Sequence, residues 1–119
     1  MRQEKTKVER PVVKYARDKL RIPVIPLKLY MGGETGIPDD LFILPDGKVL
    51  FMEFKDPDGF LSRKQIYWRT LLKLMGHKVY VCDNKEKAIE ILCKAVDAAR
   101  LSATRREVAR AEKRRRAVP

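Results

Sequence analysis

The chain has 119 residues, of which 45% are hydrophobic, and this suffices for the modest core of one domain. It carries 27 Lys and Arg against 16 Asp and Glu, so its net charge of +11 favours a polyanionic partner, most commonly nucleic acid. No apolar run approaches the roughly 20 residues that span a bilayer, and the charged N-terminus lacks an apolar signal core. We therefore expect a soluble intracellular protein with no membrane partner.

A helix is predicted over residues 6–20, where the apolar positions approximate one face, namely Val8, Val12, Val13, Ala16 and Leu20. Residues 6–9 have the form of a capping box, whereas Pro11 suits only the first turn and favours a later start. Residues 21–30 contain two prolines among β-branched residues, which indicates an edge strand or an irregular extended segment. A glycine-rich loop follows over residues 31–38.

A β-hairpin is predicted around Pro45, Asp46 and Gly47, because Pro presets the backbone angle and Asp and Gly tolerate the tight positions that follow. The flanking segments 41–44 and 48–54 are apolar and strand-like. Since both faces of the hairpin are apolar, we expect an interior pair of strands that helices cover on both sides.

A hairpin symmetric about Asp46 places Asp39 opposite Glu53, with Lys55 two residues further along on the same face. Opposed side chains have Cβ atoms only about 4.5–5.5 Å apart, and like charges there destabilise a hairpin. The pair therefore suggests a bound Mg²⁺ or Mn²⁺, which take one or two carboxylates together with water and substrate phosphate. The chemistry that this predicts is metal-assisted hydrolysis of a phosphodiester.

A second helix is predicted after a turn at residues 56–59. Ser62 and Gln65 form a capping box at its start, and Gly76 fits a stop just after Met75.

The last elements are a short strand over residues 78–82 and a helix that follows Asn84. The order α, β, β, β, α, β, α predicts an α/β fold, a small mixed β-sheet flanked by helices, because the crossover lets the last strand pair in parallel with an earlier one. We assign residues 1–103 to this domain and residues 104–119 to a basic C-terminal tail, predicted to be helical and frayed.

Four of these elements resemble the VRR-NUC domain of the PD-(D/E)xK nuclease superfamily. They are Gly-Ile-Pro-Asp at 36–39, Glu-Phe-Lys at 53–55, Leu-Ser-Arg-Lys-Gln at 61–65, and Gly76 before a short strand. Their order and spacing carry the resemblance, which covers about residues 9–84. It implies a restriction-endonuclease-like αβββαβα core.

The resemblance also implies roles for individual residues. Asp39 and Glu53 would bind the metal ion, and the carbonyl group of Phe54 would add a backbone ligand. Lys55 would position or activate the attacking water and help to neutralise the scissile phosphate.

Glu9 and Gln65 match two further positions of the family, and each has a structural alternative. Glu9 would bind the metal through a water molecule, or pair with Thr6 in a cap. Gln65 would contact water, the metal shell or phosphate, or only cap Ser62. Asp40 projects to the opposite face, where a supporting or structural role is expected.

Small members of this family resemble phage and bacterial homodimers that cut branched DNA, as Holliday junction resolvases do. The resemblance thus implies a structure-specific endodeoxyribonuclease in the bacterial cytoplasm or a phage-infected host cell. Candidate DNA contacts are Arg63, Lys64, Tyr67, Arg105, Arg106 and Arg110. Two alternatives stay open, a nicking or end-processing nuclease on simple DNA and a non-catalytic basic DNA-binding module.

Overall fold

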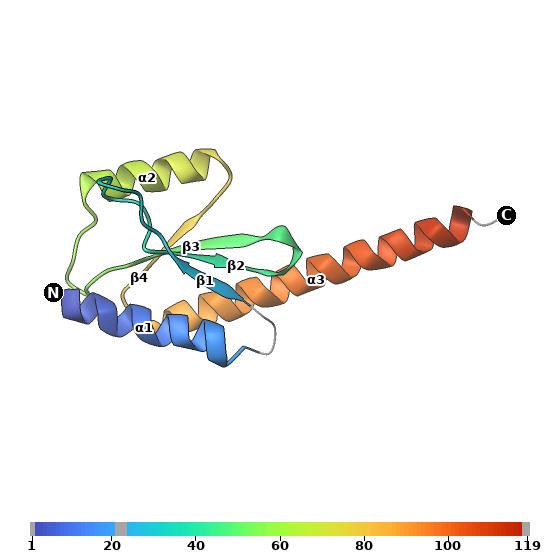
Figure 1. The fold of residues 1–119 in the computed structure, drawn as a ribbon, viewed down its shortest axis with the longest axis horizontal. Coiled ribbons are helices and arrows are strands. Elements are labelled where there is room, and N and C mark those ends of the chain that lie inside the picture. Colours follow the sequence, from blue (N-terminus) through green and yellow to red (C-terminus); the bar gives the residue numbers. More distant parts are fainter. Residues whose placement is uncertain (1, 21–23, 118–119) are drawn as a thin grey trace.

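The computed structural model describes residues 2–20 and 24–117, and its elements follow the predicted order. They are α1 (Arg2–Asp18), β1 (Ile25–Lys28), β2 (Asp40–Ile43), a 3₁₀ turn η1 (Pro45–Gly47), β3 (Val49–Phe54), α2 (Arg63–Leu74), β4 (Val79–Cys82) and α3 (Lys85–Ala117). The four strands form one sheet in the order β1-β2-β3-β4. The first three are antiparallel and β4 is parallel to β3, so the sheet is mixed, as predicted (Figure 1).

The core lies between one face of the sheet and the helices α1 and α3, while α2 lies on the other side (Figure 1). Phe42, Met52 and Phe54 alternate with outward residues along β2 and β3 and have no exposed surface. Val12 of α1 and Leu92 of α3 meet them from below the sheet and are also fully buried. These contacts fix α1 against the strands that carry the predicted site.

The hairpin has the predicted register. Ile43 pairs with Val49 and Leu41 with Phe51, so the two strands are symmetric about Asp46. Asp46 and Gly47 have φ angles of 62° and 66°, the left-handed region that Asp and Gly tolerate best. The turn chemistry therefore sets which side chains oppose each other at the far end of the strands.

The prediction that helices cover both faces of this hairpin is met only in part. On the α2 side, Ile25, Leu27, Ile43 and Val49 are 52%, 41%, 36% and 36% exposed. No residue of α2 is buried, and among the strands this 12-residue helix has its main contacts with β4. Part of this apolar face of the sheet is thus left open.

The first helix begins earlier than predicted. It starts at Arg2, so Thr6 lies inside the helix and does not cap it, and Pro11 lies inside it as well. Proline removes one backbone hydrogen bond of the helix. Packing of Val8 and Val12 into the core compensates for that loss. Local helix propensities do not include such tertiary contacts, so they predicted a later start.

The second helix has the predicted ends. Ser62 Oγ accepts a hydrogen bond from the Gln65 backbone N–H, and the Gln65 side chain accepts one from the Ser62 N–H. Gly76, with a φ of 88°, follows the last turn.

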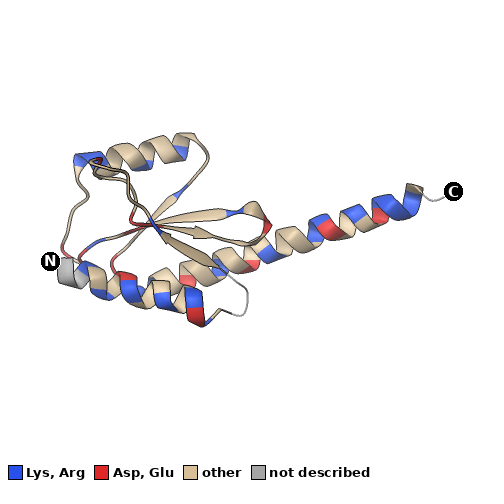
Figure 2. Cartoon of the chain, in the orientation of Figure 1, with Lys and Arg blue, Asp and Glu red and all other residues tan. Residues whose placement is uncertain are grey.

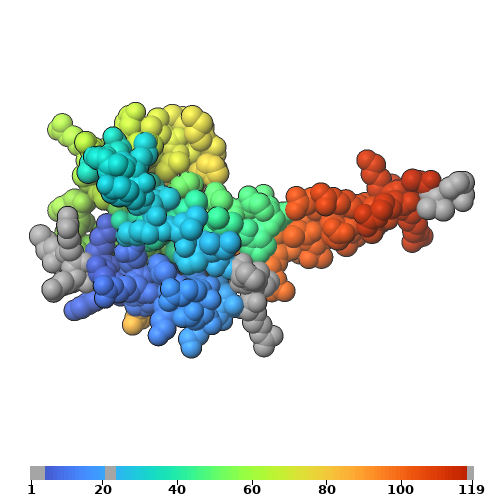
Figure 3. Space-filling model, viewed as in Figure 1, coloured from blue at the N-terminus to red at the C-terminus, as the bar shows by residue number. Residues whose placement is uncertain are grey.

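The third helix runs without a break through the predicted tail to Ala117, and its outer half projects from the body of the molecule (Figures 1 and 3). The hairpin tip holds it where it leaves the body. Asp46 accepts a hydrogen bond from the Ser102 hydroxyl at 2.7 Å and forms an ion pair with Arg106. Within the described part of the chain, no helix combines the length and the apolar composition needed to cross a membrane.

Candidate active site

Asp39 and Glu53 meet at one end of the sheet. Asp40 pairs with Met52, so the same register places Asp39, the residue before β2, opposite Glu53 on β3. Asp39 Oδ2 accepts a hydrogen bond from the Phe54 backbone N–H at 2.7 Å, which holds this carboxylate against β3. The opposed pair of carboxylates that the hairpin symmetry predicted is therefore formed.

A lysine from α1 lies between these carboxylates. Lys5 Nζ is 2.8 Å from Asp39 Oδ1 and 3.5 Å from Glu53 Oε1. Sequence reasoning missed Lys5, because the predicted helix began at Thr6. One signal in the sequence could have found it. Lys5 is four residues before Glu9, so the two side chains lie on the same face of α1, next to the face that packs on the core.

The electrostatics of the pair depend on burial and on its neighbours. Burial and then the nearby Asp39 carboxylate raise the pKa of Glu53, which is only 3% exposed, to about 7. Partial burial alone would lower the pKa of Lys5, but the two carboxylates outweigh it and raise that pKa. The site thus favours a cation between Asp39 and Glu53.

Gln65 forms the predicted cap and also contacts the candidate ligand Glu53. Its Oε1 atom accepts a hydrogen bond from the Ser62 backbone N–H, while its Nε2 atom donates a hydrogen bond of 2.7 Å to Glu53 Oε1. The capping box therefore orients an amide that restrains Glu53.

The expectation that Lys55 joins the two carboxylates is not met by its side-chain contacts. Lys55 Nζ donates to the carbonyl oxygens of Asp56 and Gly59, both at 3.2 Å, and lies 3.8 Å from Asp83 Oδ2. The carbonyl groups of the turn at residues 56–59 attract its ammonium group away from the pair. The described ammonium beside Asp39 and Glu53 is that of Lys5.

Glu9 lies on the other side of the sheet end, with Asp40. Glu9 pairs with Lys28 of β1, and no contact with Asp39 or Glu53 is recorded for its described side chain. Burial and a proton shared with Glu9 raise the pKa of Asp40 to about 8. Burial would raise the pKa of Glu9, but the hydrogen bond from Asp40 and the ion pair with Lys28 lower it, so this proton resides on Asp40.

Most of the predicted DNA contacts are exposed. Arg63 and Lys64 lie at the start of α2, beside the capping box that holds Gln65. Tyr67 is 58% exposed, whereas its neighbour Trp68 is half-buried and donates to Glu34 Oε1 at 3.3 Å.

The predicted contacts on α3 differ from one another. Arg105 and Arg110 are exposed, while Arg106 is paired with Asp46 at the hairpin tip. Lys and Arg recur along the outer half of the helix (Figure 2). A DNA contact by Arg106 would therefore compete with its structural role.

The described side chains contain no group of three or more His, Cys, Asp and Glu residues arranged to hold a metal ion. Asp39 and Glu53 alone fit an ion such as Mg²⁺, which typically uses one or two protein carboxylates and keeps several waters. The Lys5 ammonium group shows that the space between them accepts a positive charge.

Comparisons with known proteins identify relatives of this chain. No family model matches it. It is 35% identical over 66 residues to "Putative nuclease p44" of Acyrthosiphon pisum secondary endosymbiont phage 1, and the match covers 56% of this chain and 71% of that protein. Its fold is similar to a solved structure described as "VRR_NUC domain", with a TM-score of 0.63 and 24% identity over 75% of this chain and 94% of that one. The chain therefore belongs to the family of this phage putative nuclease, and its fold is that of the VRR_NUC domain.

Proposed function

We propose that the protein is a Mg²⁺- or Mn²⁺-dependent endodeoxyribonuclease that prefers branched DNA. The observation that carries this proposal is the opposed pair of Asp39 and Glu53 with a cationic group between them. Outside a metal or lysine site, such a pair would destabilise the hairpin. Because the relative of this chain is a putative nuclease, we assign phosphodiester hydrolysis to this pair of carboxylates.

Three groups of this chain would bind the metal ion. Asp39 and Glu53 would contribute carboxylate oxygens. The Phe54 N–H already points to Asp39, and the N–H and C=O of one strand residue point to the same side, which supports the Phe54 carbonyl as the third ligand. The bound metal would polarise a phosphate oxygen and lower the pKa of a water molecule.

The other residues would orient these groups and the substrate. Gln65 would keep Glu53 in one rotamer through the hydrogen bond described above. Lys55, on a four-carbon flexible side chain, would leave the turn at residues 56–59 and offset the charge that develops on the scissile phosphate. Glu9 would bind the metal ion through a water molecule. Its role would be the least direct, because its carboxylate is paired with Lys28 and not with the groups around Asp39.

A homodimer would supply two sites for the two equivalent strands of a branched junction. Two observations support it. The sheet face at Ile25 and Ile43 is exposed, and so are Ile66, Leu74 and Met75 at the second helix, of which Leu74 and Met75 are 75% and 74% exposed. We expect a mass of two chains by light scattering.

Cleavage assays on four labelled DNAs test this function. A four-way junction, a splayed arm, a duplex and a single strand are each incubated with and without Mg²⁺. The junction should be cut only with Mg²⁺, and Lys55→Ala should abolish cleavage while binding stays within about twofold, because one charge among many contributes little to affinity. Lys7→Ala, an exposed position on α1, is the matched control and should cut normally.

Other outcomes would favour the alternatives. Equal cutting of duplex and junction would indicate a nicking or end-processing nuclease. Salt-sensitive binding with no cleavage by the wild type in Mg²⁺ would indicate a binding module and would refute the proposal.

A further inference from the structure

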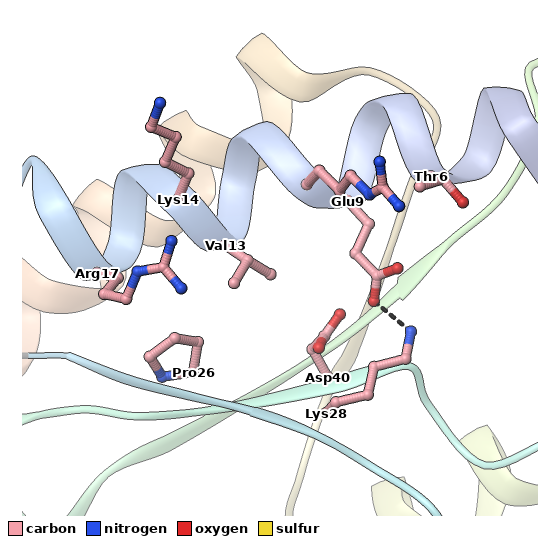
Figure 4. A pocket seen from close by; sticks show the side chains of 9 residues that line it. Thr6, Glu9, Val13, Lys14, Arg17, Pro26, Lys28 and Asp40 are labelled. Atoms are coloured by element: carbon pink, nitrogen blue, oxygen red, sulfur yellow. Dashed lines mark hydrogen bonds and ion pairs between the residues drawn. The ribbon is translucent and has the colours of Figure 1, made fainter.

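A basic groove runs between α1 and β1 (Figure 4), and none of the predicted DNA contacts lines it. Its volume is about 770 Å³. Val13 of α1 and Pro26 of β1 face each other across it and give it an apolar floor (Figure 4). An open groove of this kind between a helix and an edge strand admits an elongated ligand.

Four basic side chains line the groove. Arg10, Lys14 and Arg17 follow one another at i, i+4 and i+7, so they lie on one face of α1 at intervals of about 6 Å and 4.5 Å along its axis. Lys28 lies opposite them on β1. Such a row of positive charges complements the phosphates of one nucleic-acid strand.

Neighbouring acids leave most of this charge available. Lys28 pairs with Glu9 at the end of the groove nearest the carboxylate site (Figure 4). Arg17 lies 3.2 Å from Asp18 Oδ1, but both groups are exposed and such surface pairs are weak and screened by salt. The row on α1 therefore remains a positive surface.

The groove does not include Lys5, Asp39 or Glu53 in its lining, but its Glu9 end lies close to them. Glu9, at its near end, is one helical turn from Lys5, about 6 Å along α1. Lys5 contacts both Asp39 and Glu53. A strand whose phosphate reached these carboxylates could continue along α1 in the groove.

We propose that this groove binds the phosphate backbone of a single-stranded DNA arm adjacent to the cleaved bond. The inference rests on the proposed nuclease function and names a feature of its substrate. The groove volume is within the range of about 300–1,000 Å³ that holds small ligands. Because this volume is that of a small-ligand site, we assign the groove to one strand and not to a B-DNA duplex, whose major groove alone is about 12 Å wide.

Binding measured without divalent metal tests the groove separately from cleavage. Fluorescence anisotropy would follow a labelled splayed arm, a single strand and a blunt duplex over a salt series. The groove variant carries Arg10→Gln, Lys14→Gln and Arg17→Gln. The control removes the same charge from exposed positions outside the groove, Lys7→Gln, Lys19→Gln and Lys85→Gln.

The salt dependence gives the decisive number. Each phosphate contact on a single strand contributes about 0.7 to the slope of log K against log salt, so the groove variant should lose about 2 from this slope relative to the control. Binding to the blunt duplex should be equal in both variants. Equal slopes in the two variants, or equal losses on duplex and splayed arm, would overturn the inference.

Nuclear magnetic resonance of the wild type guards against a misfolded variant. Titration with a short oligothymidine in chelator should shift the amide signals of Arg10, Lys14, Arg17 and Lys28. Shifts confined to α2 and α3 would place the strand elsewhere and refute the groove.

Cleavage by the wild type separates the two proposals. If the wild type cuts DNA while the groove and control variants bind alike, only the groove inference fails. If the groove variant alone loses single-strand binding but the wild type cuts nothing, the groove stands and the nuclease function fails.

Discussion

Lys5 forms ion pairs with two carboxylates at the end of a hairpin far from it in the sequence. Its ammonium group lies where the proposed metal would have to bind, so the lysine and the metal compete for the same oxygens. The hairpin symmetry predicted the carboxylate pair because the turn at Asp46 is local. It could not predict the cation, which depends on how α1 docks through Val8 and Val12.

Replacing Lys5 by methionine should therefore tighten metal binding. Lys5→Met removes the competing charge and keeps the length of the side chain. We expect the affinity for Mn²⁺ measured by calorimetry to rise about five- to thirtyfold, which corresponds to roughly 1–2 kcal/mol. Lys7→Met is the control, since Lys7 is exposed on the same helix. Equal affinities in the two variants would show that Lys5 does not occupy the metal position.

Asp40 should make stability depend on pH. Its native pKa of about 8 exceeds the value of about 3.9 in an unfolded chain, so the native state binds the proton more tightly. The stability that this proton contributes is fully present below about pH 4 and is lost as the pH rises through about 8. Asp40→Asn removes the titration but keeps the shape of the side chain.

Urea unfolding at several pH values would measure this effect. Between about pH 5 and pH 8.5, Asp40→Asn should become more stable relative to the wild type, by up to roughly 3 kcal/mol. Glu53 also has a raised pKa, but it is present in both proteins and its contribution cancels. Asp58→Asn, at an exposed position, should show no such trend. A difference between Asp40→Asn and wild type that stays constant with pH would contradict the assignment.

The elements with local signals were predicted best. The capping box of Ser62 and Gln65 and the turn at Asp46 use residues close together in the sequence, and both are confirmed. The cover of the sheet was predicted only in part, because the extent to which α2 shields Ile25 and Val49 depends on how the helix docks. The side chain of Lys55 deviates for a similar reason, since carbonyl groups of a turn compete for it.

The loop that leads to Asp39 depends on a close approach to α2. Gly36 has a φ of 91°, and a Cβ atom there would lie 2.6 Å from the backbone carbonyl carbon of Lys64. The positive φ angle and the close contact both disfavour any residue with a side chain at position 36. Gly36→Ala should lower the free energy of unfolding by about 2–4 kcal/mol, from backbone strain and overpacking. Chemical denaturation would measure it.

Gly33 in the same loop provides the control. An added Cβ there would meet no atom within 4 Å. Gly33→Ala should change stability by no more than about 0.5 kcal/mol. Equal effects of the two substitutions would show that the contact between the loop and α2 does not constrain the chain.

At the scale of the whole molecule, charge and shape are distributed unevenly. The principal dimensions are 65 × 31 × 23 Å, and the outer half of α3 accounts for the elongation (Figures 1 and 3). Lys and Arg occur on all sides of this extension, with no single face reserved for them. A projecting helix of this kind adds electrostatic attraction to any DNA, whereas the sites on the body are shaped by packed elements.

Removing residues 108–119 should thus weaken binding to every DNA by a similar factor. The truncation deletes five Lys and Arg and one Glu, but it keeps Ser102 and Arg106, which anchor α3 to Asp46. The slope of log K against log salt on duplex DNA should fall by up to about 4, because each phosphate contact contributes about 0.9. Anisotropy in chelator on a junction, a splayed arm and a duplex would measure it, and an unchanged melting temperature would confirm that the anchor holds. A loss restricted to the junction would instead assign the recognition of branched DNA to the extension, since a uniform charge effect cannot distinguish one DNA shape from another.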